Sequence, residues 1–260
     1  MKHQPSLSSR LRQVVMAAAV VACAVPLAIA VAGPLDWVSG AKVQGSGKMQ
    51  KQTRALTHFT GVNFNVPGDM ELRLGNSESI TIETDDNLLP LIESVIEDGV
   101  LKIRPIKRNT NLHTRTMKIV VIAKSIDRLA LSGSGSIDSD ALKANKLQFD
   151  IGGSGSINVK GIDAEAVAIS LGGSGDMKSG AGRTNSMSVS IGGSGDVDVG
   201  KVEAGDASVS VAGSGEAIVW ARSGLSVTIA GSGDVNYYGD PKISRSVVGS
   251  GAVNRMGAAP

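Results

Sequence analysis

The sequence is poor in aromatic residues and almost without cysteine. Phe, Trp and Tyr make up 3% of its 260 residues, whereas glycine alone contributes 33. This composition favours an architecture in which backbones pass close together over an ordinary globular core. The single cysteine, Cys23, allows no intrachain disulfide and no Cys-based zinc site, and the histidines His3, His58 and His113 stand singly. A chain of this length can bury a core without such help, so the sequence predicts no cofactor.

An excess of charge of either sign is also lacking. The formal net charge is +2, but Lys2, Arg10 and Arg12 lie in the first 32 residues, which contain no acid. The rest of the chain therefore carries 23 basic against 24 acidic residues. A net charge near −1 gives no electrostatic reason to expect nucleic acid as a partner.

The N-terminus has the order of an export signal. The three basic residues precede an apolar run over residues 14–32, and Ala30-Val31-Ala32 supplies an A-x-A pattern for cleavage before Gly33. The run is also long enough to span a bilayer as an uncleaved anchor, which would give the chain membrane contact through residues 14–32. Acylation at Cys23 is a third alternative, although the residues after it stay apolar. The sequence predicts an exported protein that is periplasmic, membrane-anchored or at the cell surface.

A Gly-Ser-Gly motif recurs in the second half of the chain, first at a spacing of 20 and then, for the last two steps, at a spacing of 18. A nearly fixed period of this size is typical of a solenoid. The first glycines of the copies are Gly133, Gly153, Gly173, Gly193, Gly213, Gly231 and Gly249, and the second glycines are Gly135, Gly155, Gly175, Gly195, Gly215, Gly233 and Gly251.

Apolar residues recur at fixed distances from the motif. Counted from the first glycine, they occupy the positions four and two before it and four after it, and mostly polar or small residues lie between them. This alternation predicts one half-buried strand before each motif and another after it. Coils of about 18 to about 20 residues would then stack in parallel, so that each position forms a ladder. The motif glycines share the parity of the inward positions, which indicates a bend or a closely approaching wall.

The segment before the repeats predicts a cap on the first coil. Strands are expected at 62–66, 70–74, 80–82, 100–103 and 117–122, with a short helix over Leu88–Glu97. An uncovered strand edge invites aggregation, so a solenoid needs such a cap. The predicted divisions are a signal peptide or anchor (1–32), a linker with an isolated Gly-Ser-Gly (33–52), the cap and first coils (53–126), the repeat solenoid (127–255) and a tail (256–260).

Three segments carry a family resemblance together with the Gly-Ser-Gly-Asp copies. They are Phe59–Val62, Asp85–Pro90 and Asp98–Ile103. From about residue 53 to residue 255 the chain resembles the bacterial family described as "putative auto-transporter adhesin, head GIN domain", a domain of unknown function. The resemblance implies a right-handed parallel β-helix in the cell envelope and carries over no catalytic residues.

Motifs for catalysis are missing from the repeats. A serine-hydrolase elbow needs G-x-S-x-G, but Ser154, Ser174 and Ser194 are each followed two places later by Ser or Asp, and no histidine occurs among the copies. Dinucleotide and phosphate-loop fingerprints are incomplete as well. The sequence therefore predicts a protein that is not an enzyme.

One column of acidic residues is a weak candidate for metal binding. Asp176, Asp196, Glu216 and Asp234 follow the motif in successive coils, and the stretch 192–198 resembles the nonapeptide of calcium-binding β-rolls. The aspartates fall one place off that pattern, and the period is twice as long. A solvated acidic face explains the column more simply than a calcium site.

Two aromatic residues are the candidate ligand-binding pair. Trp220 and Tyr238 both lie seven places beyond the first glycine of successive copies, so they are expected to be outward-facing neighbours. Such a pair could stack on a sugar or dock a partner. The alternative is an aromatic ladder that stabilises adjacent coils.

The prediction is an all-β, single-stranded parallel β-helix at the cell envelope or surface that acts as an adhesion or interaction module. Its partner would be a protein or a glycan of the envelope, and self-association is compatible with the pattern. Two alternatives stay open: a polysaccharide-binding or polysaccharide-cleaving β-helix, and a structural envelope scaffold.

Overall fold

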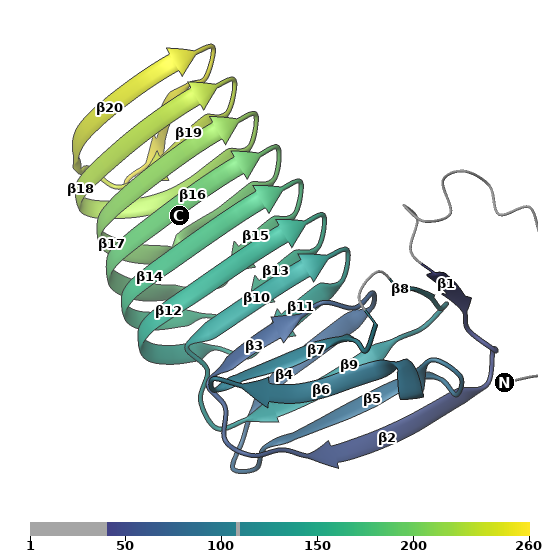
Figure 1. Cartoon of the computed structure of the whole chain (residues 1–260). Helices are drawn as coiled ribbons and strands as arrows, with labels where there is room; N and C mark the ends of the chain where they lie inside the picture. Colours follow the sequence, from purple (N-terminus) through teal and green to yellow (C-terminus); the bar gives the residue numbers. More distant parts are fainter. Residues whose placement is uncertain (1–40, 108–109) are drawn as a thin grey trace, which may run out of the picture. The chain divides into compact units, whose positions relative to one another are not determined.

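The computed structural model describes residues 41–107 and 110–260, which belong to one compact unit built almost wholly of strands (Figure 1). The predicted export signal, the A-x-A site and Cys23 lie outside the described residues. Within the described part, no helix is long and apolar enough to cross a membrane. The predicted all-β solenoid is confirmed.

Each repeat contributes a strand before the motif and a strand after it. The strands that end on the first glycine are β10 (Arg128–Gly133), β12 (Leu142–Gly153), β14 (Ile162–Gly173), β16 (Gly182–Gly193), β17 (Asp196–Gly213), β18 (Glu216–Gly231) and β20 (Lys242–Gly249). The separate strands after the motif are β11 (Ser136–Ser139), β13 (Ser156–Val159), β15 (Asp176–Ser179), β19 (Asp234–Tyr238) and β21 (Val253–Gly257). In β17 and β18 the two parts of a coil merge into one continuous strand.

Successive coils pair in parallel and in register. Phe149 pairs with Ile169, at the longer spacing of the motif, whereas Val209 pairs with Val227, at the shorter one. The change of period is absorbed by register shifts between Asp198 and Asp206. The predicted coil lengths and the predicted columns are therefore confirmed.

The inward columns form the core. Phe149, Val189 and Val227 have relative exposures of 0%, 1% and 1%. At the last coil the same columns reach solvent, because no further coil covers them: Val247 is 38% exposed, and Arg245 stands where the earlier coils have apolar side chains.

The motif glycines lie where neighbouring coils come closest. Gly153 has φ +118°, and a Cβ on it would lie 2.5 Å from the carbonyl oxygen of Gly133. A Cβ on Gly155 would lie 2.7 Å from the Leu131 side chain of the preceding coil. The Gly133 carbonyl that a Cβ on Gly153 would meet belongs to the backbone, so it has little freedom to move aside. The Ser154 N–H donates to the Gly133 oxygen at 3.0 Å, which fixes this approach from one coil to the next.

The cap is built from shorter strands of both orientations. It contains β1 (Ala41–Gln44), β2 (Met49–Ala55), β3 (Gly61–Phe64), β4 (Asp69–Leu74), β5 (Ser79–Asp85), β6 (Ile92–Glu97), β7 (Val100–Pro105), β8 (Thr110–His113) and β9 (Lys118–Ala123). Strands β3 and β4 pair in parallel with β10 and β11, so they behave as a coil that precedes the first repeat. Beyond them, β5 with β9 and β6 with β7 pair antiparallel.

Two details of the cap differ from the expectation. The helix expected over Leu88–Glu97 is only a 3₁₀ turn, η1 (Leu89–Leu91), followed by strand β6. The Asp98-Gly99 pair after it adopts positive φ at both residues (52° and 74°), which suits a tight hairpin between β6 and β7. The expected linker contains β1 and the start of β2, because partners far along the chain order these residues: β1 pairs with β8, and β2 with β5.

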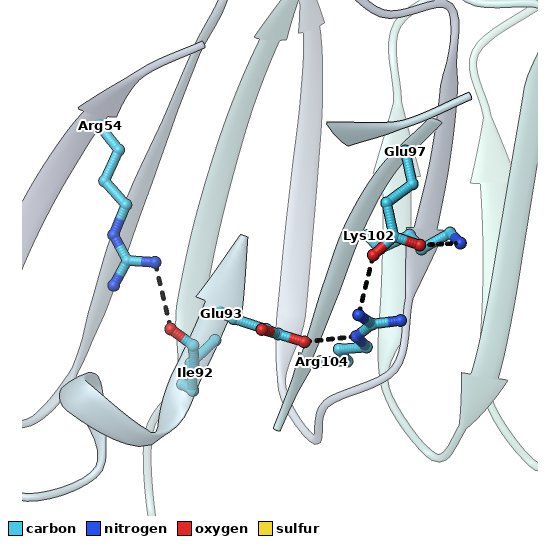
Figure 2. Close-up of polar contacts among 6 residues, drawn as sticks. All are labelled: Arg54, Ile92, Glu93, Glu97, Lys102 and Arg104. Carbon is cyan, nitrogen blue, oxygen red and sulfur yellow. Dashed lines mark hydrogen bonds and ion pairs between the residues drawn. The ribbon is translucent and has the colours of Figure 1, made fainter. Parts of the chain in front are cut away.

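The N-terminal edge of the solenoid is closed by polar contacts between its two outermost strands (Figure 2). Arg54 on β2 donates to the Ile92 carbonyl oxygen at 3.1 Å and to the Ser94 hydroxyl at 2.9 Å, both on β6. On the outer side, Arg104 contacts both Glu93 and Glu97, and Lys102 also donates to Glu97. Side chains therefore satisfy polar groups at an edge that would otherwise stay open.

Candidate functional site

Next to the motif, the outward face of the strands before it carries no charge over the last five coils; Asp206 and Lys242 occupy only the next outward position, seven places before the first glycine. Its side chains point away from the core at the positions five, three and one before each first glycine, and all but Val248 are Ser, Thr, Ala or Gly. We call this surface the hydroxyl face, and it consists of Ala168, Ser170, Gly172, Ser188, Ser190, Gly192, Ser208, Ser210, Ala212, Ser226, Thr228, Ala230, Ser244, Ser246 and Val248.

In each of the first two coils, one of the same three positions is charged. Arg128 donates to Asp150 at 3.0 Å there, with Gln148 beside them. The hydroxyl face therefore begins at the third coil, and the uncharged surface is a local property rather than one of every repeat. The sequence analysis did not predict this face, because it treated all the polar positions between the apolar ones as one group. Taken position by position, the residues five, three and one before the motif lack charge from the third coil onward.

The structure brings Trp220 and Tyr238 together as paired residues on β18 and β19. Both are half-buried. A Cβ on Gly200 would lie 3.3 Å from the Tyr238 ring, and one on Gly239 would lie 3.4 Å from the Trp220 ring, so both rings rest against glycine backbone. This packing accounts for the pair as a stabilising contact between coils and leaves part of each ring accessible.

The acidic column is also assembled as expected from the spacing. Asp176 pairs with Asp196, and Glu216 pairs with Asp234. The carboxylates accept backbone hydrogen bonds from the next coil: the Glu216 N–H donates to Asp196 at 3.0 Å and the Ala252 N–H to Asp234 at 2.8 Å. These donors relieve the repulsion between stacked acids. Among the described residues, no group of three or more His, Cys, Asp or Glu is placed to hold a metal ion.

A second charged column alternates in sign along another edge. Lys143, Asp163, Arg183, Glu203 and Arg222 follow one another through successive coils, with nitrogen-to-oxygen distances of 3.9 Å, 3.7 Å and 3.6 Å in three of the contacts. They line a groove of about 640 Å³. Glu165 also lines this groove, so its three cations face three carboxylates and the groove favours no ligand of one sign.

In the cap, the segment Asp85-Asp86-Asn87 binds the out-of-phase Gly-Ser-Gly at 45–47. The Gly47 N–H donates to Asp85 at 2.6 Å, and the Ser46 N–H donates to the Asn87 side chain at 2.9 Å. A hydrogen bond from the Thr114 hydroxyl, at 2.6 Å, lowers the pKa of Asp85 most strongly. These polar residues hold a loop in place, so their role is structural.

Two histidines lie in the part of the chain that the structure describes. They are His58 and His113, and the His58 Nδ1 atom is hydrogen-bonded to a carboxylate oxygen of Glu78 at 2.6 Å. This hydrogen bond lowers the pKa of Glu78.

Comparisons with known proteins agree with this architecture. A family model described as "Putative auto-transporter adhesin, head GIN domain" matches residues 58–241. No curated protein matches the chain.

Several solved structures share the fold. A "Putative lipid binding protein" from Parabacteroides distasonis is 27% identical, with a TM-score of 0.70 over 83% of this chain and 99% of that one. A "putative adhesin" from Bacteroides fragilis is 22% identical, with a TM-score of 0.74 over 82% and 100%. Another from Parabacteroides merdae is 21% identical, with a TM-score of 0.67 over 84% and 100%. At 22% and 21% identity, the likeness to the two adhesins shows the fold alone.

Proposed function

Since the chain belongs to the family described as "Putative auto-transporter adhesin, head GIN domain", we propose that it is a non-enzymatic adhesion or interaction module of the cell envelope. The chain is an adhesin-like β-solenoid domain. The proposal adds that it is exported, that it binds a protein or glycan there, and that it does so without chemistry.

The observation that carries the proposal is the hydroxyl face. Its backbone is held by continuous parallel pairing from β14 to β20, so the surface is rigid before any partner arrives. Preorganisation lowers the ordering cost of binding. Small side chains let a partner approach closely, and the face carries no charge whose desolvation would oppose contact.

The spacing of the hydroxyl groups favours an extended partner. Equivalent serines in successive coils, such as Ser190 and Ser210, pair directly and so lie about 4.8 Å apart. Each hydroxyl can donate one hydrogen bond and accept others. A repetitive glycan or an extended protein segment could meet several of these groups at once, which is how weak contacts add up on an adhesin.

The test is binding of the full chain to a panel of envelope polysaccharides, host glycans and matrix proteins. Ser190→Lys/Ser210→Lys places two cations in the middle of the hydroxyl face. Ser174→Lys/Ser194→Lys makes the same change at exposed motif serines of neighbouring coils. A saturable ligand lost only in the first variant supports the proposal. Release of reducing ends from any polysaccharide would instead establish an enzyme.

The Trp220–Tyr238 contact favours a second candidate, a polysaccharide-binding β-helix that uses aromatic stacking. Trp220→Ala/Tyr238→Ala separates the two. Loss of a glycan ligand in this variant, with the Ser190→Lys/Ser210→Lys variant still binding, would move the site to the aromatic pair. The description of one relative as lipid-binding adds phospholipid vesicles to the panel.

A further inference from the structure

A groove of about 1020 Å³ lies in the cap and reaches β10, so that β12 separates it from the hydroxyl face along the same sheet. Its lining comes from five places in the chain: β1, β3 with the loop that follows it, β7 with residues 105–107, β8, and the first Gly-Ser-Gly turn. Figure 1 shows β1 and β8 side by side within the cap, and their pairing is parallel from Ala41–Thr110 to Gln44–His113. Long-range pairing thus builds one wall of the groove.

The groove has a strong bias in charge. Its described lining contains Lys42, Lys102, Arg104, Lys107 and His113, and no Asp or Glu. The groove along the alternating column differs, since there three cations face three carboxylates. A ligand of negative charge is therefore favoured in the cap groove.

Of the four Lys and Arg side chains in this lining, two pair with carboxylates and two are available to a ligand. Lys102 and Arg104 contact Glu97 and Glu93 on β6, as Figure 2 shows, so they are fixed in position. Hydrogen bonds and ion pairing with Glu93 raise the pKa of Arg104. Within the described residues, no carboxylate lies within ion-pair distance of Lys42 or Lys107, and both side chains are exposed.

The rest of the lining consists largely of amides and hydroxyls. Asn63, Asn65 and Asn111 provide donors and acceptors, together with Thr110 and Ser132. Side-chain amides can donate and accept at once, which suits sugar hydroxyls. No Phe, Tyr or Trp is in the described lining, so the rows of stacking rings expected of a nucleic-acid channel are missing. Apolar side chains complete the lining at Val66, Pro67, Pro105 and Leu112.

We propose that this groove binds an acidic oligosaccharide, a polyhydroxylated chain that carries carboxylates. The lysines form ion pairs with the carboxylates, and the Asn, Ser and Thr side chains form hydrogen bonds with the hydroxyl groups of the sugar. The groove volume exceeds what a single anion needs and suits a ligand of several rings. This inference goes beyond the proposed function, because it concerns residues outside the hydroxyl face and does not depend on any ligand of that face.

The experiment compares oligogalacturonate with the same oligosaccharide after methyl esterification, which keeps the rings and removes the charge. Calorimetry with the full chain at low salt should show binding of the acid only. Lys42→Gln/Lys107→Gln should weaken binding by about fivefold to tenfold and reduce its salt dependence, because two charge contacts are lost. Asn65→Ala/Asn111→Ala should weaken it with the salt dependence unchanged.

Matched controls decide between a site and a general charge effect. Lys146→Gln/Lys178→Gln removes two lysines from the solenoid and should leave the affinity unchanged, as should Ser190→Lys/Ser210→Lys on the hydroxyl face. Equal weakening by the two lysine pairs would overturn the proposal, and so would equal binding of the esterified ligand. Absence of binding would overturn it as well. Preference for vesicles of anionic phospholipid over oligogalacturonate would assign the groove to lipid headgroups instead.

Discussion

The cap and the repeat coils are stabilised by different means. In the coils, the first motif glycine of each copy after Gly133 faces the backbone of the preceding coil, and the same contact recurs with every turn. In the cap, contacts occur once: Arg54 bridges β2 and β6, and Asp85 anchors the loop at Gly47. Changes in the coils should therefore act through steric overlap, and changes in the cap through hydrogen bonds and charge.

The largest effect is expected at a motif glycine inside the stack. Gly153→Ala should destabilise the protein by about 3 kcal/mol or more, because its Cβ would overlap the Gly133 carbonyl at positive φ. Gly133→Ala is the matched control: φ there is +111°, but no atom lies within 4 Å of the added Cβ. It should cost only about 1–2 kcal/mol. Urea unfolding of both variants measures the difference, and equal losses would contradict the role of the close approach.

A smaller effect is expected when the edge of the cap is opened. Arg54→Met removes the hydrogen bonds to Ile92 and Ser94 while it keeps a long side chain. We expect a loss of about 1–2 kcal/mol and faster amide exchange in β2 and β6. Amide exchange in β14 and β16 should not change, because each unit of a solenoid contacts only its neighbours and its stability depends mainly on them. Uniformly faster exchange would show that cap and coils unfold as one.

Asp85 should make the stability of the cap depend on pH. Hydrogen bonds from Thr114 and Gly47 lower its pKa in the folded state. Its contribution is therefore complete above the ordinary pKa of an aspartate and is lost as the pH falls through the lowered folded-state value. Asp85→Asn should lower the Tm at neutral pH and flatten its decrease in acid. Parallel Tm curves for the variant and the wild type would contradict this assignment.

The smallest effect is expected in the alternating column. Arg183→Gln removes an exposed contact to Asp163 of 3.7 Å, and such pairs contribute at most about 0.5 kcal/mol. The urea midpoint should stay nearly unchanged. A loss as large as that of Arg54→Met would mean that charge stabilises the coils as strongly as the cap, which would remove the distinction between them.

The coils were predictable from the sequence because their signal is periodic. Leu131, Ile151 and Leu171 lie at one position of the repeat, and one period assigned their strands, register and burial together. The segments of the cap each occur once, so no periodic pattern supports the assignment of their secondary structure. Its helix prediction failed at Ile92–Glu97, where the hairpin turn at Asp98-Gly99 favours a strand.

The candidate surfaces were predicted less well than the fold. The pairing of Trp220 with Tyr238 followed from their equal distance to the motif. The basic groove could not be predicted, because Lys42, Asn65 and Lys107 come together only through two long-range pairings, of β1 with β8 and of β3 with β7, which have no local signal. Side chains gathered from separate segments need the fold before they can be recognised as a site.

Adhesion of intact cells that export the full chain tests the central claim most directly. Cells with the wild-type chain should adhere to surfaces coated with the ligand found in the panel. Ser190→Lys/Ser210→Lys should abolish adhesion, and Ser174→Lys/Ser194→Lys should preserve it. Equal adhesion by both variants, or by cells without the chain, would contradict an adhesin that acts through the hydroxyl face.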